Sequence, residues 1–445
     1  MGLFSLFRQK EINKLAYPAI LAGIAEPVIS LVDTAFVGQL GTTSLAAVGI
    51  AGSFYTMMVW ILAQTLTAIA AIVSKKFGQN KLNDVKSLIP QALLSNILLG
   101  LAIYLLTSQF SELIFRFYNA DGEILAACQL YFDIRSIGFP FTLATLLLFG
   151  IFRGLQNTSW AMYIALSGAV LNILLDYLLI FGLGDKIKGM GLEGAALASL
   201  ISQITMFLLA LGFLLKNTPF NLKISLPVNP YFKELMGMSF DLFVRTILLN
   251  LTFYLATRYA TGYGKAVIAA HTIALNIWLF SSFFIDGFAH AGNAMAGRFL
   301  GESNEKALLN LGNSIGKISV LIGLGLAVIY AALYPFLIHF FTNDQMVIQE
   351  FQMVFWLVIV TQPINALAFA FDGIYKGLGY TKLLRNLLAI STLFIFVPLA
   401  TGFHYFNPSL TGIWVAFLGW MCCRSFYLLY DFKNRFNLEK YSTPQ

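Results

Sequence analysis

Long runs of apolar residues recur along the whole chain, and short segments that collect polar and charged residues separate them. A helix needs roughly 20 apolar residues to cross about 30 Å of hydrocarbon, and about twelve runs reach this length. They lack the apolar–polar alternation of membrane strands, which excludes a β-barrel. The expected spans are 15–38, 48–74, 88–110, 131–152, 160–181, 192–215, 236–258, 268–297, 311–335, 353–375, 383–402 and 410–430.

Composition agrees with a chain that lies mostly in lipid. The sequence is 58% hydrophobic and only 11% charged, whereas about a quarter of the residues of a soluble domain are charged. We therefore expect an all-α polytopic membrane protein whose main partner is the lipid bilayer.

Most Lys and Arg residues flank the expected spans on one side, which by the positive-inside rule is the cytoplasmic side. This pattern predicts a multi-pass protein of the inner (cytoplasmic) membrane with both termini in the cytoplasm. Because the basic residues are spread over many short loops, nucleic-acid binding is not expected. Those expected on the opposite side are Arg116, Arg135, Lys186, Lys188, Arg258 and Lys265.

The chain contains an internal repeat. The segment 150–158 (GIFRGLQNT) resembles 373–381 (GIYKGLGYT), and the same offset relates Pro140 to Pro363. We expect two six-span lobes, residues 1–215 and 235–445, joined by a cytoplasmic linker, 216–234. Parallel repeats of this kind predict alternating access around a central cavity, although duplication could also build a passive channel or scaffold.

Acidic side chains within the N-terminal lobe are the first candidates for chemistry, because charged groups in membrane spans are costly and usually functional. Asp33 lies inside the first span, and Asn172 and Asp176 lie one turn apart in the fifth. We expect these three to enclose a proton or a small cation, since burial and a neighbouring carboxylate both favour the protonated form. The alternative is that a hydrogen-bonded Asp merely holds two helices together.

Three further residues are weaker candidates to line the same cavity. Glu26 precedes Asp33 by about two helical turns on the same face, and Tyr131 and Asn157 flank the fourth expected span. Tyr131 could equally be an interfacial tyrosine, and Asn157 an ordinary loop residue.

The C-terminal lobe carries a different set of charges. Arg245 must be paired at hydrocarbon depth, and Asp241, Asp286 or Asp372 is its expected counter-ion. His290 lies one turn from Asp286. We interpret these five residues as a structural or gating network.

Enzymatic readings find no support in the sequence. It contains no GxxxxGK[ST] loop, no HExxH and no paired-cysteine metal motif, so neither an ATP motor nor a zinc protease is indicated. We expect no cofactor and no resident metal, and energy from an ion gradient.

Several motifs together resemble the multidrug and toxic compound extrusion (MATE) family, in its DinF-like branch, over nearly the whole chain. They are PAILAGIAEP at 18–27, VDTAFVGQLG at 32–41, DLFVRT at 241–246, FIDGFAHA at 284–291 and FDGIYKG at 371–377. The resemblance implies a twelve-helix, two-lobed, V-shaped exporter that exchanges organic cations for H⁺ or Na⁺.

The resemblance also implies roles for particular residues. Asp33 is the coupling carboxylate, Asn172 and Asp176 are members of the cation site, which could hold Na⁺, and Tyr131 is their neighbour. Pro18 and Pro27 are the points where the first helix would bend. Members of the family can place a hydroxyl from the sixth helix in the site; Ser199 supplies the only one at 195–199, and we expect it to line the cavity without counting it as a ligand. Asp372 would occupy the C-lobe cation site of the NorM-like branch, but pairing with Arg245 argues against that role.

Two other functions stay open at this point. A lipid-linked saccharide flippase usually needs a cationic cavity, whereas the N-terminal lobe is acidic. A passive channel or scaffold would show no dependence on an ion gradient. We expect the protein to act as a monomer.

Overall fold

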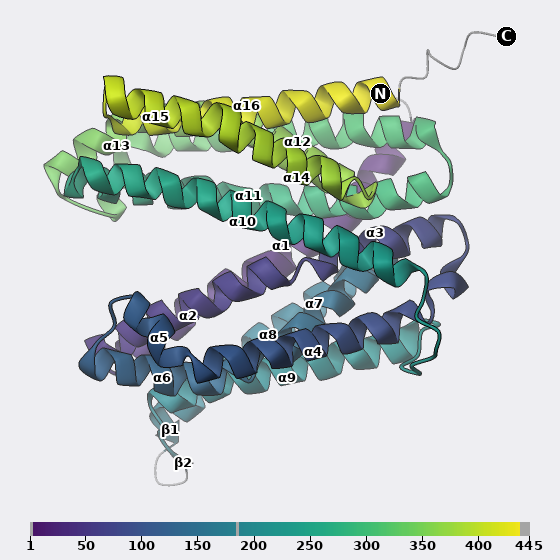
Figure 1. The fold of residues 1–445 in the computed structure, drawn as a ribbon, viewed down its shortest axis with the longest axis horizontal. Coiled ribbons are helices and arrows are strands. Elements are labelled where there is room, and N and C mark those ends of the chain that lie inside the picture. Colours follow the sequence, from purple (N-terminus) through teal and green to yellow (C-terminus); the bar gives the residue numbers. More distant parts are fainter. Residues whose placement is uncertain (1–2, 184–186, 437–445) are drawn as a thin grey trace. The chain divides into compact units, whose positions relative to one another are not determined.

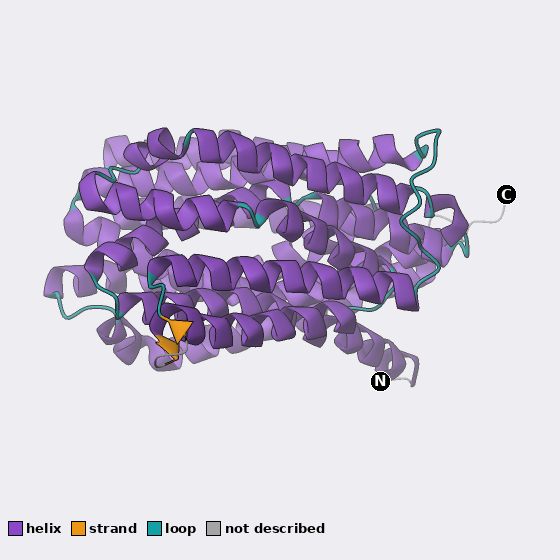
Figure 2. Ribbon diagram, turned by 90° about the horizontal axis from the view of Figure 1, so that it is seen from below, coloured by secondary structure: helices purple, strands orange, loops and turns teal. Residues whose placement is uncertain are grey.

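The structure is a computed structural model that describes residues 3–183 and 187–436; the side chains of 3–8, Glu26, Ile187 and Pro335 lie outside the described part. Nearly all of the described part is helical, as Figure 2 shows. It also contains one antiparallel pair of short strands with two residues each. Eleven described helices are long and apolar enough to cross a membrane, and a bent pair brings the number to twelve. This confirms the expected all-helical fold.

The chain divides into two compact units. Unit 2 comprises Leu21–Gly237, and unit 1 comprises Met1–Ile20 with Met238–Gln445. The helix α1 contributes to both: Ile12, Leu15 and Ala16 pack in a core cluster of unit 1. The contacts therefore group the start of the chain with the C-terminal half, whereas the sequence analysis places residues 1–215 in one lobe.

Figure 1 shows the elements of both units, coloured along the chain. Those up to the linker are α1 (Leu3–Gly38), α2 (Thr42–Leu62), α3 (Thr65–Gly78), η1 (Leu82–Val85), α4 (Leu88–Gln109), α5 (Ser111–Phe117), α6 (Gly122–Ser136), α7 (Phe139–Gly154), α8 (Ser159–Asp176), η2 (Tyr177–Phe181), β1 (Gly182–Leu183), β2 (Ile187–Lys188) and α9 (Leu192–Asn217). Those after it are α10 (Tyr231–Tyr263), α11 (Lys265–Gly301), α12 (Glu305–Leu337), η3 (Ile338–Phe340), α13 (Gln345–Gly377), α14 (Thr381–Ser391), η4 (Thr392–Phe396), α15 (Val397–Phe406) and α16 (Leu410–Arg435).

Three close helix approaches occur at equivalent places in the two units. A Cβ added to Gly150 would collide with the backbone of Leu66, and one added to Gly373 would collide with the backbone of Ala289. Two further contacts recur with the offset of the sequence repeat. Gly100–Pro140 corresponds to Gly323–Pro363, and Gly154–Ala70 corresponds to Gly377–Asn293. The sequence repeat therefore corresponds to a repeat of helix packing.

The equivalent helices differ at one point that matters for the site. In unit 1, α13 is continuous and contains Pro363. In unit 2, the corresponding segment is broken into α6 and α7, which meet at 48°. Since both copies contain a proline, Pro140 alone does not explain the break. Gly138 lies in it, where a Cβ would collide with Oε1 of Gln203 from α9.

Candidate functional site

Five predicted residues occupy the interior of unit 2. Asp33 comes from α1, Tyr131 from α6, Asn172 and Asp176 from α8, and Ser199 from α9. All five are buried, and Asp176 has an exposed fraction of 0%. Charged groups so deeply buried need a partner or a function.

The two carboxylates lie beside each other. Asp33 neighbours both Asp176 and Ser199, and Nδ2 of Asn172 donates to Oγ of Ser199 at 3.5 Å. Oδ1 of Asp33, Oδ1 of Asn172 and both oxygens of Asp176 accept no hydrogen bond from any described residue. A proton or cation between the carboxylates would supply the missing donor or charge.

Arg135 is a member of this site that the sequence analysis misses. It interacts electrostatically with both Asp33 and Asp176, and its guanidinium carbon lies 4.5 Å from the centre of the Tyr55 ring. The positive-inside count treats Arg135 as a loop residue, because it stands near the end of an apolar run. With both carboxylates ionised and no ion bound, the single guanidinium would leave the cluster with a net charge of −1.

Local features of the chain position these groups. The break after Ser136 ends α6 one residue beyond Arg135. On the other side, α8 ends at Asp176 and continues into the wider turn η2. Gly194 of α9 lies against the backbone of Leu179, where an added Cβ would stand 2.6 Å from the carbonyl carbon. Only glycine permits this approach, which draws α9 and Ser199 close to the end of α8.

Other predicted residues are placed elsewhere or not described. Asn157 precedes α8, and its Oδ1 accepts from the backbone N–H groups of Ser159 and Trp160 at 3.1 and 3.4 Å. At about 1.5 Å per residue, the first residue of α8, Ser159, is roughly 25 Å along the helix from Asp176. Asn157 therefore holds the start of α8 and does not line the cluster. The side chain of Glu26 lies outside the described residues. Pro18 and Pro27 both lie within α1.

The five charges predicted for the C-terminal lobe form more than one group in unit 1. Nη2 of Arg245 lies 2.6 Å from Oδ1 of Asp372, so Asp372 is the counter-ion among the three expected alternatives. Oδ2 of Asp372 pairs with Lys376 at 2.7 Å. Asp286 interacts electrostatically with Lys376. His290, one turn further along α11, is half-buried.

Asp241 does not join Arg245, although the two lie one turn apart on α10. Its oxygens accept from Nη1 of Arg385 at 2.6 Å and from the Thr381 hydroxyl at 2.9 Å, both on α14. Among the described residues, the partners of Asp241 therefore lie outside the predicted group of five. Long guanidinium side chains can reach partners on neighbouring helices as readily as on their own.

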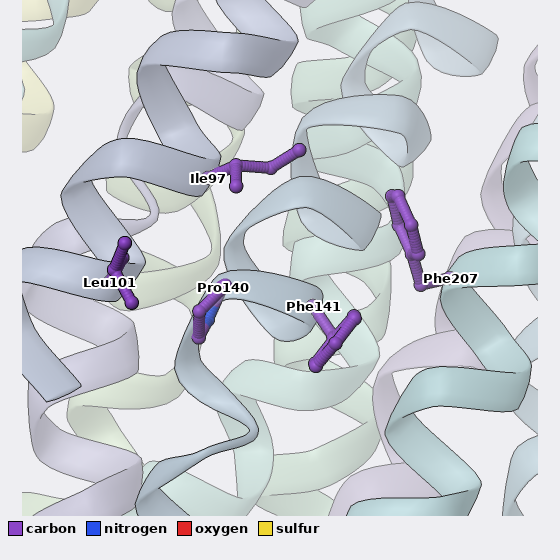
Figure 3. A pocket seen from close by; sticks show the side chains of 5 residues that line it. All are labelled: Ile97, Leu101, Pro140, Phe141 and Phe207. Carbon is purple, nitrogen blue, oxygen red and sulfur yellow. The ribbon is translucent and has the colours of Figure 1, made fainter.

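A pocket of about 170 Å³ lies elsewhere in unit 2. Figure 3 shows its lining side chains from α4, α7 and α9: Ile97, Leu101, Pro140, Phe141 and Phe207. The lining is apolar, and none of the residues of the carboxylate cluster contributes to it. The pocket therefore offers a hydrocarbon surface and no site for an ion.

Comparisons with known proteins bear on both units. The MatE family model matches residues 18–178 and 242–401. The chain is 30% identical to the "Probable multidrug resistance protein NorM" of Photorhabdus laumondii, covering 86% of this chain and 85% of that protein. It is 26% identical to the "DNA damage-inducible protein F" of Escherichia coli K12, covering 86% and 83%.

Similarity to solved structures extends over almost the whole chain. A crystal structure of a MATE protein in the bent conformation superposes with a TM-score of 0.90 at 21% identity, covering 98% of this chain and 96% of that one. The matched family segments fall in both halves of the sequence repeat. The chain therefore belongs to the MATE family and is a multi-pass secondary active transporter.

Proposed function

We propose that this protein exports organic cations and other drug-like molecules in exchange for H⁺ or Na⁺ by alternating access, with Asp33 as the coupling carboxylate. The observation that carries the proposal is the buried pair of carboxylates, Asp33 and Asp176: three of their four oxygens, Oδ1 of Asp33 and both of Asp176, lack hydrogen-bond donors among the described residues. Two neighbouring buried carboxylates repel each other, so binding of one proton or cation between them is favourable.

The charge of the cluster sets the number of ions. Arg135 offsets one of the two carboxylates, so one bound H⁺ or Na⁺ makes the cluster neutral. A cationic substrate attracted by the same negative charge would then be disfavoured. Exchange follows when the ion and the substrate bind differently to the two states of the transporter.

The other site residues have supporting roles in this proposal. Asn172 and Ser199 supply neutral oxygens beside the carboxylates, and Tyr131 supplies a hydroxyl in the same interior. Pro18 and Pro27 are points at which α1 could bend, because each removes a backbone hydrogen bond from the helix. Both termini and the linker face the cytoplasm of a cell whose inner membrane holds the protein, as the Lys and Arg distribution predicts.

The substrate class rests on the relatives. The similar protein from Photorhabdus laumondii is described as a probable multidrug resistance protein. The acidic cluster of unit 2 favours cationic cargo over the pyrophosphate of lipid-linked saccharides. Flipping of such lipids remains the alternative, and passive flux is the third.

The proposal is tested by efflux of ethidium from proteoliposomes under an imposed pH or Na⁺ gradient. Wild type should export under one of the two gradients, and Asp33→Asn should lose the gradient-driven part. Asp121→Asn is the matched control, because Asp121 lies in the same unit with an exposed side chain at the start of α6.

Each result has a clear meaning. Loss in Asp33→Asn with full activity in Asp121→Asn supports coupling through Asp33, and the effective gradient names the ion. Full coupled export by Asp33→Asn would contradict the proposal. Absence of export under both gradients would favour the flippase or the passive alternative.

A further inference from the structure

Unit 1 contains three cations in a buried group around Asp372. They are Arg245 on α10, Lys376 on α13 and Arg424 on α16. Arg245 has an exposed fraction of 7% and Arg424 one of 2%. The two arginines and Asp372 influence each other electrostatically. Three helices that are distant in the sequence therefore bring positive charge to one place.

The carboxylate of Asp372 is already engaged. Its Oδ1 pairs with Arg245 at 2.6 Å and its Oδ2 with Lys376 at 2.7 Å. Asp286 lies within electrostatic reach of Lys376. The group thus contains two carboxylates and three cations, and each oxygen of Asp372 already has a charged donor.

Arg424 is the cation left over. Its Nη1 lies 3.3 Å from Sδ of Met421, and its guanidinium carbon lies 4.7 Å from the centre of the Trp420 ring. No ion pair joins it to a carboxylate within the described ranges 3–183 and 187–436. A thioether is a weak acceptor, and an indole face does not neutralise a full charge. A guanidinium that is almost wholly buried in a membrane protein needs an anion.

We propose that Arg424, with Arg245 beside it, forms a binding site for one oxyanionic group, a carboxylate or a phosphate. The planar guanidinium can offer two parallel N–H donors to such a group. The ring of Trp420 lies under the guanidinium and holds it in place. The site is separate from the Asp33 cluster, lies in the other unit and has the opposite charge, so the inference does not depend on the coupling role of Asp33.

The site extends the range of molecules that the transporter can hold. A molecule with an anionic group, or a zwitterion, could bind in unit 1 through Arg424. The oxyanion could instead belong to the headgroup of a membrane lipid, because the same chemistry recognises both. The source is decided by experiment.

The test measures equilibrium binding of radiolabelled succinate and of inorganic phosphate to the purified full-length protein. Nanodiscs of neutral phosphatidylcholine are used, so that no anionic lipid competes. Wild type should show saturable binding of at least one probe, and Arg424→Gln should weaken it at least ten-fold. Arg424→Lys, which keeps the charge but not the planar fork, should weaken it less.

Arg435→Gln is the matched control. Arg435 lies on the same helix, but it is more exposed and pairs with Asp431 at 2.6 Å. Its replacement should leave binding unchanged. Size-exclusion profiles of all variants identify any that fail to fold.

Two results would overturn the proposal: no saturable binding of either probe by wild type, or equal binding by wild type and a folded Arg424→Gln variant. The wild-type measurement keeps the test decisive even if a variant does not fold. A second arm adds anionic phosphatidylglycerol to the nanodiscs. If the anionic lipid displaces the probe from wild type and has no such effect on Arg424→Gln, the site binds a lipid phosphate. If binding of the probe is undiminished, the site binds a soluble anion. Either result supports the site.

Discussion

Asp33 on α1 and Asp176 on α8 lie side by side in the interior of unit 2, and both of the Asp176 oxygens lack a hydrogen-bond donor among the described residues. Replacement of Asp176 by Asn tests the pair. With one carboxylate removed, Arg135 balances Asp33 and the cluster no longer requires an ion. We expect gradient-driven ethidium efflux to fall roughly ten-fold or more, measured in proteoliposomes.

The same variant should not lose stability, because it relieves repulsion between two buried carboxylates. Its thermal unfolding temperature should equal or exceed that of wild type. A clear fall in that temperature would mean that Asp176 has a structural role, and the loss of transport would then not report on coupling.

Arg135→Gln should tighten binding of the coupling ion, because it removes a positive charge next to Asp33 and Asp176. If the ion is H⁺, the pH at half-maximal efflux should move upward by about one unit; if it is Na⁺, the half-saturating concentration should fall about ten-fold. Arg116→Gln is the control, since Arg116 is exposed on α5 and pairs with Glu112 at 2.9 Å. An unchanged pH or Na⁺ dependence would show that Arg135 does not act on the cluster.

Asp372→Asn should destabilise unit 1. Removal of this carboxylate leaves Arg245 and Lys376 without their partner, which for a buried pair costs about 3 kcal/mol or more of unfolding free energy. Asp344→Asn is the control. Asp344 is exposed and caps the start of α13, a role that Asn can also fill, so this change should alter the unfolding free energy by less than about 0.5 kcal/mol. Denaturant titration of both variants measures the difference, and equal stability would show that the pair is not needed.

Gly373→Ala tests the helix approach shared by the two units. The new Cβ would stand 2.7 Å from the carbonyl carbon and Cα of Ala289, so α11 and α13 must move apart. We expect a loss of about 1–3 kcal/mol in unfolding free energy.

Gly325→Ala on α12 is the matched control for that change, since nothing lies within 4 Å of its added Cβ. At this position the higher helix propensity of alanine should raise the unfolding free energy of the protein by up to about 1 kcal/mol. Equal effects of the two substitutions would contradict the close approach.

Much of this protein could be predicted from local patterns. The spans follow from run length, because hydrocarbon thickness limits each helix separately. The fourth span, 131–152, was predicted as one helix, yet the structure breaks it into α6 and α7. At the break, the side chain of Gln203 from α9 lies close against Gly138, and no pattern within the span contains that contact.

Asp33, Asn172 and Asp176 could be selected from sequence alone, because each is a costly polar group inside an apolar run. Their spacing on α8 likewise follows from the helix period. The tertiary structure decided which further groups surround them. Arg135 interacts with both carboxylates, although nothing in its own span indicates this. Ser199, which the family resemblance suggested, lies beside them where α9 packs closely on α8.

The sequence by itself determined the membrane-spanning class, the repeat and the buried acids, since these depend on composition and period along a single helix. Only the tertiary structure decided the partners of the charges: Asp372 and not Asp241 for Arg245, Arg385 for Asp241, and no ion pair with a described carboxylate for Arg424. Coulomb energy in a medium of low dielectric depends on distances of a few ångströms. Those distances are set by the packing of helices that lie far apart in the chain.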